Sequence, residues 1–320
     1  MFHYDRALKL TRAGLAIDAR HRQPRGFISH AHSDHMARHE LALCTPATGL
    51  LYQLRMKGGD VLELPYRQPY VVGDVRLTTY PAGHCLGSAM LLAEDGDQSM
   101  LYTGDFKLGE SATSERAELP RADILVMETT YGVSRYRMPP REEVVDKLER
   151  LIRLAIDAGR VALIFAYALG KAQEVTRLLT LRGLRVRQHP EIAMVSKVYQ
   201  ECGVDLGPYQ VLTRENCREP AVAIVPPWGR RGGPAFDFDA PVKFAVTGWS
   251  IDEATRYRHG VDYALPLSDH ADFDELFEAV ERVRPRVIYC THGPESFVDR
   301  LREAGHEAYP LGKAWQKRLF

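Results

Sequence analysis

The sequence predicts an α/β protein of two domains, and three observations carry this prediction. Its 320 residues exceed what one ordinary hydrophobic core holds. Strand-like runs dominate the chain up to Gly132, whereas helical and strand-like patterns alternate beyond it. Histidines and carboxylates repeatedly follow strand-like runs, and functional groups of layered α/β proteins collect at the carboxyl ends of strands.

The first part of the chain is expected to be mostly strands. A helix opens at Thr45-Pro46, because proline is favoured at the first helical position. The runs 89–93 and 100–103 alternate and flank a turn, which predicts an antiparallel hairpin. The expected strands are 7–11, 14–18, 26–29, 41–44, 61–64, 70–72, 75–80, 89–93, 100–103 and 124–127.

From residue 142 onward the pattern predicts a βαβ-type unit that continues to about Gly260. Residues 142–158 form an amphipathic helix, with Val144, Leu148 and Ile152 on its apolar stripe. The further helices are expected at 169–174 onward, 191–201, 273–283 and 294–304, and the strands at 161–167, 209–212, 221–225, 242–247, 263–267 and 286–290.

The most informative motif is His-x-His-x-Asp-His, formed by His30, His32, Asp34 and His35. Alternate residues of an extended chain leave the same face, so His30 and His32 can point together. With the carboxylate and third imidazole that follow, they predict a cradle for two adjacent metal ions. The alternative is a solvated histidine-rich loop, which the preceding strand-like run disfavours.

Further candidate groups stand alone at strand ends. They are Asp18, His84, Asp105, Glu128, His270 and His292. The remaining histidines have no such context and are read as surface or core residues: His3, His21, His39, His189, His259 and His306.

Composition excludes several classes of protein. The formal net charge is zero, so no polyanionic partner is indicated globally. Five cysteines without a Cys-x-x-Cys pair argue against a disulfide framework and a thiolate zinc site. The first ten residues lack the apolar core of a signal peptide, and no apolar run approaches about 18 residues. We therefore expect a cytoplasmic protein without a membrane span.

The ordered set of motifs resembles the metallo-β-lactamase fold. Glu128 in Glu-Thr-Thr-Tyr-Gly, His270 in Ser-Asp-His-Ala-Asp and His292 in Thr-His-Gly resemble three further motifs of its β-CASP nuclease branch. The resemblance implies an αββα sandwich with an inserted β-CASP α/β domain. The implied boundaries are 1–134 for the first part of the sandwich, 135–262 for the inserted cap and 263–320 for the return.

The resemblance also implies a ligand set for two divalent metal ions. One ion would take His30, His32 and His84, the other Asp34, His35 and His292, and Asp105 would bridge them. Imidazole and carboxylate ligands suit zinc, with manganese as the alternative. Asp18 would lie behind the histidines as an orienting acceptor, unless it is an ordinary turn aspartate.

The implied chemistry is phosphodiester hydrolysis. A hydroxide between the metals attacks phosphorus, and His270 protonates the leaving oxygen as general acid. Glu128 would hold His270 and raise its pKa. The alternatives are a metal-ligating or structural His270, and a Glu128 that is merely a strand-end charge.

The neutral total hides a charge asymmetry. Residues 135–262 contain 20 Lys and Arg against 16 Asp and Glu, whereas the remainder contains 22 against 26. A basic cap and an acidic, metal-binding base suit a phosphate backbone, although a solvated face explains most of these charges equally well. The candidate nucleic-acid contacts are Lys171, Arg230, Arg231, Arg256 and Arg258.

These features predict a metal-dependent DNA exonuclease, acting in DNA repair with a DNA ligase and a helicase as functional partners. The compact cap is similar to that of bacterial ligase-associated DNA exonucleases, a group also described as like mRNA 3′-end processing factors. An RNA-processing ribonuclease is the alternative, because His292 is typical of the RNA-processing members. A small-molecule thioester or lactone hydrolase would not need Glu128 and His270, and an inactive scaffold would not keep the ligands.

Overall fold

The computed structural model describes residues 1–227 and 236–312. The chain divides into two compact units. The first unit comprises Met1–Arg135 and the chain from His270 onward, and the second comprises Tyr136–Asp269. None of the described helices is long and apolar enough to cross a membrane.

The first unit contains two sheets. One sheet has the order β1 (Phe2–Tyr4), β2 (Leu8–Leu10), β3 (Leu15–Ile17), β4 (Arg25–Phe27), β5 (Leu41–Cys44) and β6 (Val61–Glu63). The other has the order β19 (Ala308–Pro310), β18 (Val287–Thr291), β11 (Ile124–Glu128), β10 (Ser99–Tyr102), β9 (Ala89–Glu94), β8 (Val75–Pro81) and β7 (Tyr70–Val72). Its helices are α1 (Pro46–Met56), α6 (Phe273–Val283) and α7 (Glu295–Glu303).

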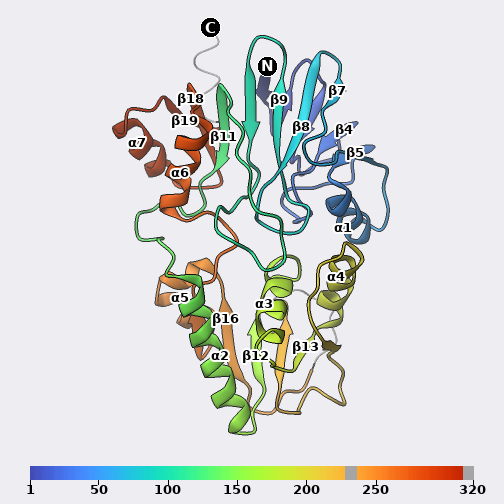
Figure 1. Cartoon of the computed structure of the whole chain (residues 1–320), viewed down its shortest axis with the longest axis vertical. Coiled ribbons are helices and arrows are strands. Elements are labelled where there is room, and N and C mark those ends of the chain that lie inside the picture. Colours follow the sequence, from blue (N-terminus) through green and yellow to red (C-terminus); the bar gives the residue numbers. More distant parts are fainter. Residues whose placement is uncertain (228–235, 313–320) are drawn as a thin grey trace. The chain divides into compact units, whose positions relative to one another are not determined.

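The alternation of side chains on β11 shows how the layers pack. Ile124 and Val126 join the core that both sheets share, whereas Leu125 and Met127 join a second core with residues of α6 and α7. Successive strand residues point to opposite faces, so this sheet is covered on both sides. Figure 1 shows α6 and α7 beside β11 and β18. Because α1 contacts β5 and β6, the layers form the αββα sandwich that the sequence predicts.

The second unit is a parallel sheet with helices, as the strand and helix alternation predicts (Figure 1). The strand order is β14 (Tyr209–Val211), β13 (Val186–Gln188), β15 (Val222–Val225), β12 (Ala162–Phe165), β16 (Val242–Val246) and β17 (Tyr263–Leu265). The helices are α2 (Arg141–Asp157), α3 (Lys171–Thr180), α4 (Pro190–Glu201), the 3₁₀ helix η1 (Gly248–Ile251) and α5 (Ala254–Arg258).

Strand β17 lies on the other side of the expected division. The sequence predicted that the sandwich resumes at residue 263, whereas Tyr263–Leu265 pairs with β16 in the second unit. The compact units accordingly divide after Asp269. The register of β17 places Leu265 beside Val246, and such a pairing between distant segments leaves no trace in the local pattern. Strands β1 and β13 were not predicted.

Asp123 fastens the start of β10 to the start of β11, and its bonds predict an acid-sensitive stability. Its Oδ2 accepts hydrogen bonds from the backbone N–H of Ser99 at 2.8 Å and from Ser99 Oγ at 2.9 Å. These bonds, with the nearby Arg286 guanidinium, hold the pKa of Asp123 below its usual range. A carboxyl group whose pKa is lower in the folded state stabilises the fold at pH values above its unfolded-state pKa, which is about 4 for aspartate. This stabilisation is lost as the pH falls through the folded-state pKa.

We therefore expect Asp123→Asn to lower the thermal unfolding midpoint more at about pH 6 than at about pH 3. Circular dichroism of both proteins at both pH values measures this difference. Asp97→Asn is the matched control, because Asp97 is an aspartate with an 80% exposed side chain in the same unit. A midpoint difference that does not change with pH would contradict the role of the ionised carboxylate.

Candidate metal centre

Strand ends of both sheets of the first unit supply the predicted ligands. His30, His32 and His35 follow β4, His84 follows β8, and Asp105 follows β10. His292 directly follows β18. The sheets share one core, and these ends lie at the same edge, so residues far apart in the sequence meet there.

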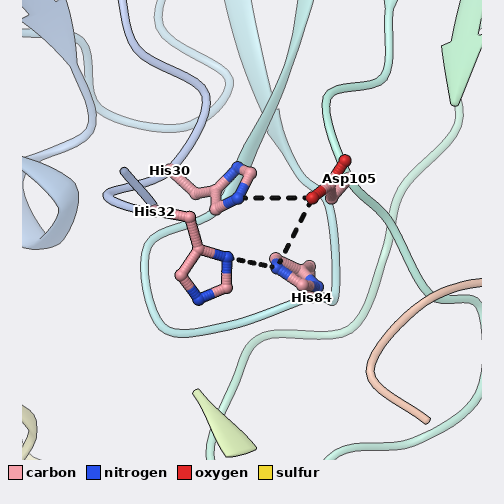
Figure 2. A group of neighbouring side chains, drawn as sticks. All are labelled: His30, His32, His84 and Asp105. Carbon is pink, nitrogen blue, oxygen red and sulfur yellow. Dashed lines mark hydrogen bonds and ion pairs between the residues drawn. The ribbon is translucent and has the colours of Figure 1, made fainter. Parts of the chain in front are cut away.

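The first ligand group consists of His30, His32, His84 and Asp105, whose ligand atoms all lie within 4.8 Å of one another (Figure 2). Asp105 Oδ2 lies 3.5 Å from His30 Nε2 and 3.9 Å from His84 Nε2. His84 Nε2 lies 3.1 Å from His32 Nδ1. Three imidazole nitrogens and a carboxylate facing one another form a donor set that zinc accepts.

The second group consists of His35, Asp105 and His292, which also lie within 4.8 Å of one another. Asp105 Oδ2 is 3.3 Å from His35 Nε2, and Asp105 Oδ1 is 3.9 Å from His292 Nδ1. Asp105 therefore takes part in both groups, because Oδ2 lies near His30, His84 and His35 and Oδ1 lies near His292. Asp34 is the one expected ligand that belongs to neither group. Its half-exposed carboxylate lies 3.9 Å from His35 Nε2 and 4.0 Å from Arg20.

The chemistry of the buried atoms fits divalent cations. His30 is fully buried, and its Nε2 has no hydrogen-bond partner within the described part of the chain. Burial, followed by the neighbouring His35 and His84, lowers the pKa of His30 well below its usual value, which favours the neutral imidazole that metals bind. An uncompensated buried nitrogen is costly, and a metal ion would satisfy it.

The charge of Asp105 supports the same interpretation. Burial alone would raise the pKa of Asp105, but His35 and His270 outweigh it and lower that pKa well below the usual range. Burial likewise opposes protonation of His35, yet Asp105 and then Asp18 raise the pKa of His35 well above its usual value. The negative field that retains a proton on His35 would equally stabilise a cation.

Asp18 lies behind the cluster, where the sequence predicted an orienting acceptor. Its Oδ2 accepts hydrogen bonds from His35 Nδ1 at 2.7 Å, Ser29 Oγ at 2.6 Å and Tyr102 Oη at 2.8 Å. Its Oδ1 accepts a bond from the backbone N–H of Ser29 at 2.8 Å. Because Asp18 fixes the proton on Nδ1, Nε2 of His35 is the nitrogen that would bind a metal ion in place of its second proton.

Two of the predicted residues adopt strained backbone conformations. Asp18 has φ 45° and His292 has φ 57°, in the left-handed region that non-glycine residues rarely occupy. Beside His292, a Cβ on Gly293 would lie 2.0 Å from the Thr129 carbonyl oxygen. The sequence therefore needs glycine at residue 293 for the backbone of β18 to pass close to the end of β11.

His270 and Glu128 form a pair beside the ligand groups. His270 Nδ1 lies 2.9 Å and 3.0 Å from the two carboxylate oxygens of Glu128. Glu128 is buried and also accepts bonds from the Phe106 backbone N–H at 2.8 Å and Thr130 Oγ1 at 2.5 Å. The ring centroid of His270 is 4.6 Å from that of His84. Glu128 thus holds Nδ1 of His270, and the imidazole lies beside a metal ligand.

The residues predicted to contact nucleic acid differ in their surroundings. Lys171 is 1% exposed, and its ammonium donates to the Leu267 carbonyl at 2.9 Å with two carboxylates beyond it. This environment does not fit the phosphate-binding role that we expected, because the ammonium is enclosed by protein oxygens. Arg256 is exposed beside the Tyr257 ring, and Arg258 bonds to Asp252 at 2.8 Å. Arg230 and Arg231 lie outside the described residues.

Sequence reasoning missed three side chains that support the centre. Tyr102 and Ser29 donate to Asp18, and Thr130 donates to Glu128. Only their closeness to Asp105, His30 and Glu128 in the sequence could have indicated them.

Similarity to known proteins identifies the family. Residues 258–315 match the family model described as "Zn-dependent metallo-hydrolase RNA specificity domain". A protein of Opitutus terrae named "Probable DNA ligase" is 36% identical over 99% of this chain and 31% of its own length. The chain belongs to the Zn-dependent metallo-hydrolase family. Its fold is the metallo-β-lactamase sandwich with a β-CASP domain.

Other relatives of this metallo-hydrolase carry different names. "Endoribonuclease YSH1" of Candida albicans is 36% identical over 82% of this chain and 37% of its own length. "Transcription termination factor FttA" of Methanothermobacter thermautotrophicus is 42% identical over 34% of this chain and 18% of its own. The chain thus spans about a third or less of these relatives.

A solved structure supports the fold alone. A protein of unknown function from Enterococcus faecalis V583 aligns with a TM-score of 0.58 and 15% identity, covering 89% of this chain and 78% of its own.

Proposed function

We propose that this metallo-hydrolase is a two-metal phosphodiesterase that acts as a DNA exonuclease in DNA repair. The observation that carries this proposal is the His270–Glu128 pair beside the ligand groups. The sugar oxygen that leaves a phosphodiester is a poor leaving group and needs a proton. A thiolate leaves without one, so a thioester hydrolase would have no use for this pair.

The chain's residues divide the chemistry between them. His30, His32, His84, His35, His292 and Asp105 would hold the two ions, with Asp34 as a further predicted ligand. When bound, divalent metal ions supply Lewis acidity toward a phosphodiester and lower the pKa of water. Zinc suits these ligands best, and manganese is the alternative. Glu128 keeps the proton on His270 Nδ1, so that Nε2 can face the leaving oxygen.

The choice of DNA as substrate rests on the relative from Opitutus terrae. That protein is named a probable DNA ligase, and nearly the whole of this chain aligns with part of it. A nuclease that trims DNA ends could act before a DNA ligase seals them. We therefore propose a functional association with a DNA ligase and a helicase. A cytoplasmic location is part of this proposal, and the five cysteines form no disulfide.

An RNA-processing ribonuclease is the second candidate. Residues 258–315, which include His292, match a model whose name refers to RNA specificity. Several relatives are named endoribonucleases. Proteins tell RNA from DNA through the 2′-hydroxyl, which a DNA enzyme excludes or leaves without a partner.

End-labelled DNA and RNA of one sequence, incubated separately with the metal-loaded protein, test the proposal. We expect stepwise release of nucleotides from linear DNA, much slower turnover of RNA, and survival of closed circular DNA. Affinity for DNA should fall steeply with salt, because phosphate contacts release counterions. Faster turnover of RNA than of DNA would favour the second candidate, and rapid nicking of circles would exclude an exonuclease.

A further inference from the structure

Lys171 is a buried cation at a position that disfavours a cation. It is the first residue of α3 and is 1% exposed. The dipole of a helix opposes positive charge at its N-terminus, and burying a charge costs free energy unless partners compensate it. The side chain therefore depends on specific partners.

Those partners join two distant segments of the second unit. The ammonium lies 3.6 Å from Glu174 Oε2, which is within α3, and 3.4 Å from Asp269 Oδ1. It donates a 2.9 Å hydrogen bond to the carbonyl oxygen of Leu267, 96 residues further along the chain. Glu174 also bonds Arg141 at 2.6 Å. Lys171 thus ties the start of α3 to the segment that follows β17.

That segment leads directly to His270. Leu267 and Asp269 come three residues and one residue before it. On the other side of His270, the backbone N–H of Ala271 donates to the Phe106 carbonyl at 2.6 Å, and the Phe106 N–H donates to Glu128 at 2.8 Å. The backbone after His270 is therefore fixed through the residues that hold its imidazole. The backbone before it is fixed by Lys171.

We propose that Lys171 is a positioning residue for His270, acting through the backbone of residues 267–269. This inference rests on the proposed function, since it takes His270 as the group that protonates the leaving oxygen. Without the ammonium, this segment loses that hydrogen bond and that ion pair, and the backbone that leads into His270 is held less firmly. A misplacement of about 1 Å at a reacting group can lower turnover about 10²-fold.

The test compares two substrates that differ in their need for a proton. Turnover of DNA and of a nitrophenyl phosphodiester is measured for the wild type and for Lys171→Met. We expect DNA turnover to fall about 10²-fold, while turnover of the nitrophenyl ester and the metal content stay close to wild type. Because both rates scale with the folded fraction, their ratio is insensitive to partial unfolding.

Two further variants separate positioning from stability. Arg187 on β13 is another buried cation of the second unit, bonded to the Asn216 carbonyl at 2.7 Å and to Glu219. Arg187→Met should lower the thermal midpoint without changing the ratio of the two rates. Lys171→Arg keeps the charge and a donor, and it should restore most of the ratio.

Two outcomes would contradict the proposals. If Lys171→Met lowers the turnover of DNA and of the nitrophenyl ester equally, the ratio of the two rates is unchanged and the positioning role is overturned. A metal-loaded wild type that hydrolyses neither ester overturns the proposed function instead. The two failures are therefore distinguishable.

Discussion

Asp105→Ala should lose both metal ions and the activity that depends on them. Asp105 places oxygens within 3.3 to 3.9 Å of His30, His35, His84 and His292, so it is the only described residue common to both ligand groups of the proposed centre. Removing it also leaves several buried imidazoles without the negative charge that they face. Replacing a residue behind a metal ligand costs about 10 to 100-fold in affinity or activity, and loss of a bridging ligand should cost more.

Elemental analysis of protein prepared without chelator measures this effect. We expect about two divalent ions per chain in the wild type and much less than one in Asp105→Ala, with turnover reduced more than about 10²-fold. Asp97→Ala is the control, since the side chain of this aspartate is 80% exposed and its carboxylate forms an ion pair with Arg12. A metal-free variant with wild-type turnover would falsify the metal-dependent mechanism.

The sequence predicted the sandwich because its signals are local. The alternating runs at 89–93 and 100–103 became the antiparallel pair β9 and β10, in which Glu94 lies opposite Ser99. The predicted ligands converge because each follows a strand end, and these ends of the two packed sheets lie at one edge. That rule brought His30, His84 and Asp105 together without any knowledge of distance.

Contacts between distant segments could not be predicted in this way. Tyr102 donates to Asp18 across 84 residues, and Lys171 reaches Leu267 across 96. A lysine at a helix start looks the same in the sequence whether its ammonium faces solvent or two carboxylates of the protein. The expected phosphate contact at Lys171 does not fit for this reason, and the division at residue 263 differs because β17 pairs with β16.

His270→Ala should separate the proton donor from the metal ligands. His270 bonds Glu128 through Nδ1, and its ring lies 4.6 Å from that of His84, but it belongs to neither of the two ligand groups proposed for the metal ions. We therefore expect the variant to keep its metal ions while turnover of DNA falls about 10² to 10⁴-fold, which is the usual contribution of a general acid.

The leaving group decides the role of this histidine. A nitrophenolate departs almost without protonation, so His270→Ala should hydrolyse a nitrophenyl phosphodiester nearly as fast as the wild type. His259→Ala, at an exposed histidine of α5's C-terminal end, controls for the substitution itself. Equal damage to both substrates, together with loss of metal, would make His270 a ligand, because a ligand acts before any bond to the leaving group breaks.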